Sequence, residues 1–112
     1  MTVTAATLEG ALARARADLQ ASAGGAAVCT FTRAGIPVPS VKLHEGAWAA
    51  LSEVRRQGRR GRDPLEQVAQ DVRSRWAADL ELRRQRDAGP DWVAYLLGGV
   101  EALDRLLDPD SP

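Results

Sequence analysis

Residues 55–62 read Arg55-Arg56-Gln57-Gly58-Arg59-Arg60-Gly61-Arg62, which places five arginines within eight positions. The next four residues, Asp63-Pro64-Leu65-Glu66, have the pattern of a helix start. Asp63 suits the N-cap and Pro64 the first helical position, while Glu66 can complete a capping box. Free N–H groups at a helix N-terminus attract anions. A cationic turn that leads into such a terminus therefore predicts phosphate binding.

We expect the phosphate contacts to come from the arginines of this turn. The guanidinium group is a planar fork of donors that matches phosphate oxygens. The alternative is a solvated loop, which is what most runs of like charge are. The predicted phosphate-binding residues are Arg55, Arg56, Arg59, Arg60 and Arg62.

The charge of the chain is unevenly distributed, although its formal net charge is zero. Residues 33–62 carry seven basic and two acidic side chains, a balance of +5. Residues 63–112 carry six basic and eleven acidic side chains, a balance of −5. Such a chain can present a basic face to a polyanion while its other half stays acidic. This pattern makes nucleic acid the first partner to consider.

Length and composition indicate one domain, residues 1–112, with a thin core, because 20 residues are alanine. A thin core favours pairing with a second copy, so we expect a homodimer. Cys29 is the only cysteine, which excludes an internal disulfide and favours a reducing, cytoplasmic location. The longest apolar run, residues 92–100, is too short to cross a bilayer, so we expect no membrane association.

The predicted fold class is α+β: mostly helical, with a short β ribbon or hairpin and about four helices. Residues 28–32 favour a strand, and Pro37 and Pro39 argue against helix in the residues before them. Whether strand 26–33 pairs within the chain or across a dimer is left open by the sequence. The expected elements are an N-terminal helical arm (1–25), an extended or β segment (26–43), a helix-turn-helix pair (44–87) and a C-terminal helix (90–107).

Apolar residues at helical spacing predict which faces are buried. Trp48, Leu51 and Val54 form such a stripe, and the three tryptophans of the chain are expected to anchor the core. Gly98 and Gly99 interrupt an otherwise good helix. Either close packing against a neighbouring helix or a break into two shorter helices explains them.

Residues 38–76 resemble the ribbon-helix-helix DNA-binding family. Val41-Lys42-Leu43 is similar to the end of its ribbon, and Trp48, Leu51 and Val54 follow Leu43 at the spacing of its first helix. Gly58 falls in the turn, Asp63 at the cap, and Leu65 and Ala69 on core positions of the second helix. The resemblance covers about a third of the chain.

The resemblance implies a dimeric DNA-binding regulator of transcription. Two copies would pair their strands, and the resulting ribbon would enter the major groove of double-stranded DNA. The arginine turn would hold the phosphate backbone of the DNA and set the register of the protein on the duplex. The base-contacting residues that it implies are Val38, Ser40 and Lys42.

A second hypothesis is a non-enzymatic α+β module that binds a protein partner and no DNA. It predicts association through a stripe on the C-terminal helix. That stripe consists of Trp92, Leu96, Val100 and Leu103.

No pattern in the sequence indicates catalysis. His44 is the only histidine and Cys29 the only cysteine, so a zinc site would need carboxylates alone for its remaining ligands. We therefore expect no enzyme activity, no catalytic residues, no cofactor and no metal.

Overall fold

Four helices account for most of the residues that the computed structural model describes, namely 3–23, 39–87 and 89–109. The helices are α1 (Ala5–Ala23), α3 (Pro39–Arg60), α4 (Leu65–Gln85) and α5 (Pro90–Leu107).

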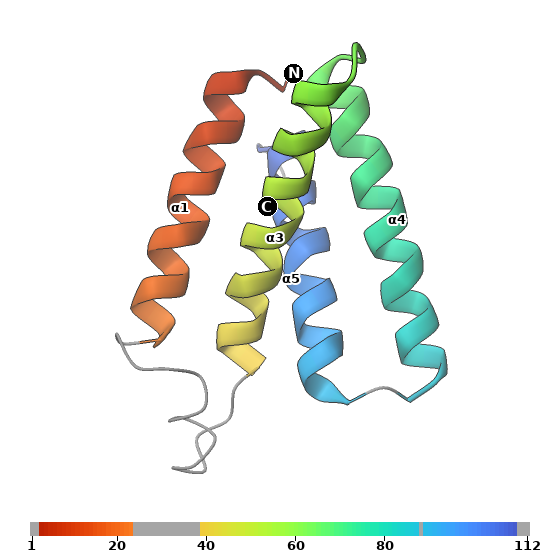
Figure 1. Ribbon diagram of the computed structural model, residues 1–112. Coiled ribbons are helices and arrows are strands. Elements are labelled where there is room, and N and C mark those ends of the chain that lie inside the picture. The colour runs from red at the N-terminus through yellow and green to blue at the C-terminus, as the bar shows by residue number, and fades with distance from the viewer. Residues whose placement is uncertain (1–2, 24–38, 88, 110–112) are drawn as a thin grey trace.

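The helices lie side by side and alternate in direction along the chain (Figure 1). α3 packs against α1, α4 and α5, and α5 packs against both α3 and α4. The turn between α3 and α4 therefore lies at one end of the bundle, and the start of α5 lies towards the other (Figure 1). No helix of the described ranges has the length and apolarity needed to span a membrane.

The predicted α+β fold is wrong, because the described residues contain helices and no strand. Residues 39–43, which we expected to be extended, form the first turn of α3. Pro39 stands at the first helical position, where a proline costs no hydrogen bond, so it starts this helix instead of excluding it. The remainder of the expected β segment, residues 26–38, lies outside the described residues.

α3 and α5 approach each other closely near Leu43. A Cβ atom on Gly98 would overlap the Leu43 carbonyl, and one on Gly46 would overlap the Tyr95 carbonyl. The two backbones therefore touch at two glycines, one on each helix. α5 is unbroken through Gly98 and Gly99, so close packing is the correct explanation of this pair.

The main core lies between α3 and its three neighbours. Its fully buried side chains include Leu12 of α1, Leu51 and Val54 of α3, Val72 of α4 and Leu103 of α5. A second cluster joins the far half of α4 to the start of α5, with Leu80, Leu96 and Val100 at its centre. The predicted inward positions of α3 and α4 are thus buried, except that Trp48, Leu65 and Trp76 are only partly covered.

The turn between α3 and α4 is tighter than the sequence predicted. α3 continues to Arg60, and the Gly61 amide closes it by donating to the Gln57 carbonyl at 3.0 Å. α4 begins at Leu65 with Pro64 as N-cap, and no side chain caps it. The predicted capping role of Asp63 is therefore wrong, because the helix starts one residue later and leaves this carboxylate outside it.

Candidate functional site

The predicted phosphate-binding arginines gather at one end of the bundle, on the last turns of α3 and the following turn. Arg55 differs from the others, because its guanidinium pairs with Glu9 of α1 at 3.3 Å. The remaining four are exposed, and no carboxylate of the described residues lies within ion-pair distance of them. We call these four the arginine end: Arg56, Arg59, Arg60 and Arg62.

Two opposing electrostatic effects act on the arginine end. Arg56 and Arg60 are four residues apart on α3, so their like charges repel by roughly 0.2–0.5 kcal/mol. Arg59 and Arg60 stand in the last turn of α3, where the helix dipole favours cations. Next to them, the uncapped N-terminus of α4 leaves backbone N–H groups without a side-chain acceptor. The arrangement is an open cationic surface with backbone donors beside it.

The predicted base-contacting residues do not join this surface. Val38 lies outside the described residues, and Ser40 falls in the first turn of α3. The Lys42 ammonium pairs with Glu45 at 3.1 Å. Lys42 and Arg60 are both on α3, eighteen positions apart, which is about 27 Å along the helix axis.

The ribbon-helix-helix expectation is therefore wrong for this chain. Its ribbon would have to include residues 39–43, and these are helical. The carbonyl groups of these residues, which would pair two strands, instead accept the first hydrogen bonds of α3, whose start packs on α5.

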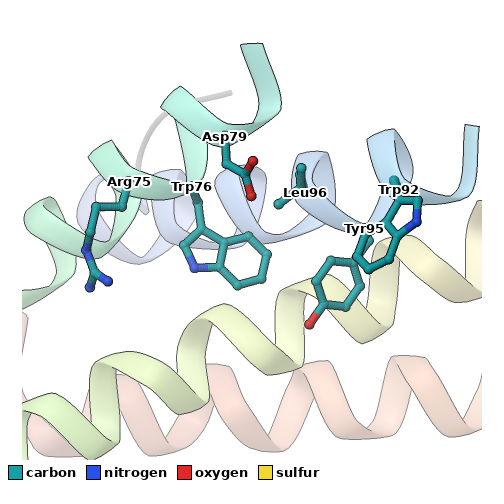
Figure 2. Close-up of a pocket in the computed structure, with 6 residues that line it drawn as sticks. All are labelled: Arg75, Trp76, Asp79, Trp92, Tyr95 and Leu96. Atoms are coloured by element: carbon teal, nitrogen blue, oxygen red, sulfur yellow. The ribbon is translucent and has the colours of Figure 1, made fainter. Parts of the chain in front are cut away.

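A second site lies where α4 and the first half of α5 face α3, and its centre is a cluster of three aromatic rings. Trp76 and Tyr95 stack with centroids 5.4 Å apart, and Trp92 meets Tyr95 edge to face at 6.1 Å. We call Trp76, Tyr95 and Trp92 the aromatic cluster. Figure 2 shows Trp76 reaching across from α4 and the Tyr95 hydroxyl pointing toward α3.

Ion pairs surround the aromatic cluster. Glu53 of α3 accepts a hydrogen bond from the Trp76 indole N–H at 2.8 Å and one from Arg75 at 3.3 Å. On the other side, the Arg83 guanidinium lies 5.2 Å from the centre of the Trp92 ring, a cation–π contact. Arg83 also pairs with Asp79 at 3.4 Å. The cluster is therefore fixed by polar contacts from both α3 and α4.

Two hollows flank the pair formed by Trp92 and Tyr95. The first, of about 410 Å³, is lined by Lys42, Asp91, Trp92 and Tyr95, and we call it the α3–α5 hollow. The second, of about 310 Å³, is the α4–α5 hollow (Figure 2). It is lined by Arg75, Trp76, Asp79, Trp92, Tyr95 and Leu96.

Burial and nearby charges both act on the Tyr95 hydroxyl. Partial burial raises the pKa of Tyr95 above 10.0, and the nearby carboxylates of Glu45 and Glu53 raise it further. Lys42 acts in the opposite direction. Tyr95 is therefore a neutral phenol at physiological pH.

The stripe that we expected to mediate association is mostly internal. Leu96, Val100 and Leu103 are buried in the two core clusters, so they are not available to a partner. Trp92, which we expected in the core, is 55% exposed. It stands in the first turn of α5, where Arg83 of α4 and Tyr95 contact it but leave about half of it open to solvent. Only this residue of the stripe is open to solvent.

Sequence reasoning missed the aromatic cluster as a site. The spacing of Trp92 and Tyr95, three residues apart on α5, was a usable signal that the two rings share a face. The contribution of Trp76 and Glu53 required the packing of α4 and α3 to be known. Within the described ranges, no group of three or more metal-ligating side chains comes together. Cys29 lies outside these ranges.

Comparisons of the chain with protein-family models, with curated proteins and with solved structures return no match. The functional reading therefore rests on the two sites described above.

Proposed function

We propose that this chain is a small, non-enzymatic DNA-binding protein that holds the phosphate backbone of duplex DNA through its arginine end. The observation that carries the proposal is the gathering of Arg56, Arg59, Arg60 and Arg62 on one exposed end, without carboxylate partners among the described residues. Arginine is well suited to paired contacts with phosphate oxygens.

The neighbouring start of α4 supports the same proposal. Its first N–H groups have no side-chain cap, so a phosphate oxygen held by Arg62 can also accept from them. Repulsion between Arg56 and Arg60 is relieved when a polyanion lies against them. Both effects favour the bound state over the free protein.

The proposed mode of binding reads no base sequence. Lys42 lies near the opposite end of α3 and is paired with Glu45, so it is remote from DNA held at the arginine end. Contacts to phosphates alone give affinity without sequence preference. We therefore expect an architectural or accessory role in the handling of DNA instead of the recognition of one operator.

A homodimer and a cytoplasmic location remain predictions that accompany this proposal. The first rests on the alanine-rich core, and the second on the single cysteine. Sedimentation equilibrium of the purified protein measures the first, with a mass of 24 kDa expected, twice the 12.0 kDa of one chain. A mass that stays at that of one chain at all concentrations contradicts the dimer.

The proposal is tested by fluorescence anisotropy of a labelled random-sequence duplex at several salt concentrations. Four arginine–phosphate contacts predict that log K falls with log salt at a slope of about −3.6. Duplexes of different sequence should bind within about twofold of each other. Absence of binding at low salt contradicts the proposal.

A charge-matched pair of variants locates the binding surface. Arg59→Gln/Arg60→Gln/Arg62→Gln removes three of the four contacts and should reduce the slope to about −0.9. The control, Arg14→Gln/Arg84→Gln/Arg86→Gln, changes net charge by the same amount at three other exposed arginines. It should keep a slope close to that of the wild type. Equal weakening by both variants would show that net charge, and not the arginine end, governs binding.

A further inference from the structure

The charges around the aromatic cluster leave one carboxylate without a partner. Three cations and three carboxylates neutralise each other there, in the pairs Lys42–Glu45, Arg75–Glu53 and Arg83–Asp79. Asp91 also lines the α3–α5 hollow, and no cation of the described residues lies within ion-pair distance of it. The site therefore has room for one further positive charge.

The chain itself shows what kind of cation fits beside Trp92. On the α4 side, the Arg83 guanidinium lies over the Trp92 ring and pairs with the Asp79 carboxylate. On the α3 side, the hollow places another carboxylate, Asp91, next to Trp92 and Tyr95. The same combination of a carboxylate and an aromatic face thus occurs twice, and only one of the two holds a guanidinium.

We propose that the α3–α5 hollow binds an arginine side chain presented by a partner polypeptide. The guanidinium pairs with Asp91 and lies against the exposed Trp92 ring and the partly buried Tyr95 ring. The partner is a basic, arginine-containing segment, because the hollow offers one unpaired negative charge and aromatic faces, a combination that favours a cation. This proposal does not depend on DNA binding at the arginine end.

The dimensions and polarity of the hollow agree with this occupant. Its volume of about 410 Å³ exceeds that of one side chain, which leaves space for the flanking backbone. The Tyr95 hydroxyl donates to none of the described side chains, so it can donate to a carbonyl of the incoming segment. The raised pKa of this hydroxyl keeps it protonated for that role. Lys42 does not repel the ligand strongly, because Glu45 neutralises it at 3.1 Å.

Asp91 also has an ordinary structural role that the test must separate from binding. It stands in the first turn of α5, where a carboxylate stabilises the positive end of the helix dipole. Loss of that role changes the stability of the protein and leaves the affinity for a ligand unchanged. Affinity is therefore the quantity to measure.

The experiment titrates the full chain with two peptides and follows the tryptophan indole N–H resonances by NMR. The probe is acetyl-Gly-Gly-Arg-Gly-Gly-amide, and the control replaces arginine by citrulline, which has nearly the same shape and no charge. We expect the Trp92 resonance to shift with the arginine peptide and the affinity for the citrulline peptide to be about tenfold lower. Equal affinities for the two peptides would overturn the proposal.

Variants then assign the binding to the hollow. Asp91→Asn and Trp92→Leu should each weaken binding of the arginine peptide severalfold. Glu101→Gln, which removes another exposed carboxylate from α5, should leave it unchanged. A wild-type-like spectrum outside the site confirms that each variant is folded. If Asp91→Asn binds as tightly as wild type, the hollow is not the site.

A second copy of the chain is the competing occupant, because its arginine end also presents guanidinium groups. Sedimentation of the wild type and of Asp91→Asn distinguishes the two. A foreign partner predicts that both proteins have the same association state. Association that is lost in Asp91→Asn would overturn the proposed partner in favour of a second copy.

Discussion

Gly98 is the glycine of α5 whose missing side chain lets this helix touch the backbone of α3. A Cβ atom there would meet the Leu43 backbone, which cannot move without displacing the start of α3. We expect Gly98→Ala to lower the free energy of unfolding by about 2 kcal/mol, since overpacking outweighs the gain of about 1 kcal/mol in helix propensity. Urea denaturation followed by circular dichroism measures this change.

Gly10 provides the matched control for Gly98. It stands within α1, is exposed, and a Cβ atom on it would have no neighbour within 4 Å. Gly10→Ala should therefore stabilise the protein by about 0.5–1 kcal/mol, because only the helix propensity changes. Two substitutions of the same chemistry are thus expected to have opposite signs. Equal effects would show that the close crossing of α3 and α5 does not exist.

Tyr95 makes stability depend on pH in the alkaline range. Burial and then Glu45 raise its pKa above the value of 10.0 that it has in an unfolded chain. Below pH 10 Tyr95 is protonated in both the folded and the unfolded state, so it adds no pH dependence to stability there. Above that pH the unfolded state loses its proton first, so stability falls as pH rises through the folded pKa. Tyr95→Phe should lessen this fall.

Tyrosinate absorbance reports this group alone, since the chain has one tyrosine. The native protein should titrate at a higher pH than the same protein in denaturant. Coincident titration curves would contradict the raised pKa.

Among the helices, α1 depends most on a single neighbour. It packs mainly on α3, through buried Leu8, Leu12 and Ala15, and Glu9 pairs with Arg55. The ion pair is largely exposed, so Glu9→Gln should lower the free energy of unfolding by less than about 1 kcal/mol. Leu12→Ala should cost about 2–5 kcal/mol. Hydrogen exchange of the α1 amides should accelerate strongly in Leu12→Ala and little in Glu9→Gln. The reverse order would mean that the ion pair, and not apolar packing, holds α1 in place.

The positions of the helices were largely predictable from the sequence, but the start of α3 was not. The apolar stripe of residues 92–107 and the Gly89-Pro90 pair before it placed α5. Pro39 was misread because proline both restricts the residue before it and suits the first turn of a helix, and the sequence alone does not decide between these effects. In the folded chain, Gly46 and Gly98 allow the start of α3 to pack against α5. This contact joins two helices that are distant in the sequence, so the local sequence does not reveal it.

The two candidate sites differed in how far the sequence revealed them. The residues of the arginine end are close together in the sequence, so their charge alone identified them. The pairing of Arg55 with Glu9 could not be predicted, because it depends on where α1 packs. The aromatic cluster joins residues from α4 and α5 with Glu53 of α3. No periodicity within one helix predicts that meeting. The exposure of Trp92 could not be predicted either, because its spacing places it on the buried stripe.

At the scale of the whole molecule, the two proposed sites lie near opposite ends of α3. Lys42 lines the α3–α5 hollow, and Arg60 belongs to the arginine end. They are eighteen positions apart on one continuous helix, or about 27 Å. Electrostatic screening acts over about 8 Å at physiological salt, so charges at one site scarcely affect the other. Under the two proposals, a basic polypeptide and DNA would therefore not exclude each other.

This separation predicts that the two ligands bind independently. Saturating duplex DNA should change the affinity for the arginine peptide by less than about twofold, and Asp91→Asn should leave the salt slope of DNA binding unchanged. The Arg59→Gln/Arg60→Gln/Arg62→Gln variant should in turn bind the peptide like the wild type. Titrating the peptide into protein with and without DNA measures the coupling directly. Strong competition would mean that DNA also covers the hollow, and strong cooperativity would mean that α3 changes between two arrangements when either end is occupied.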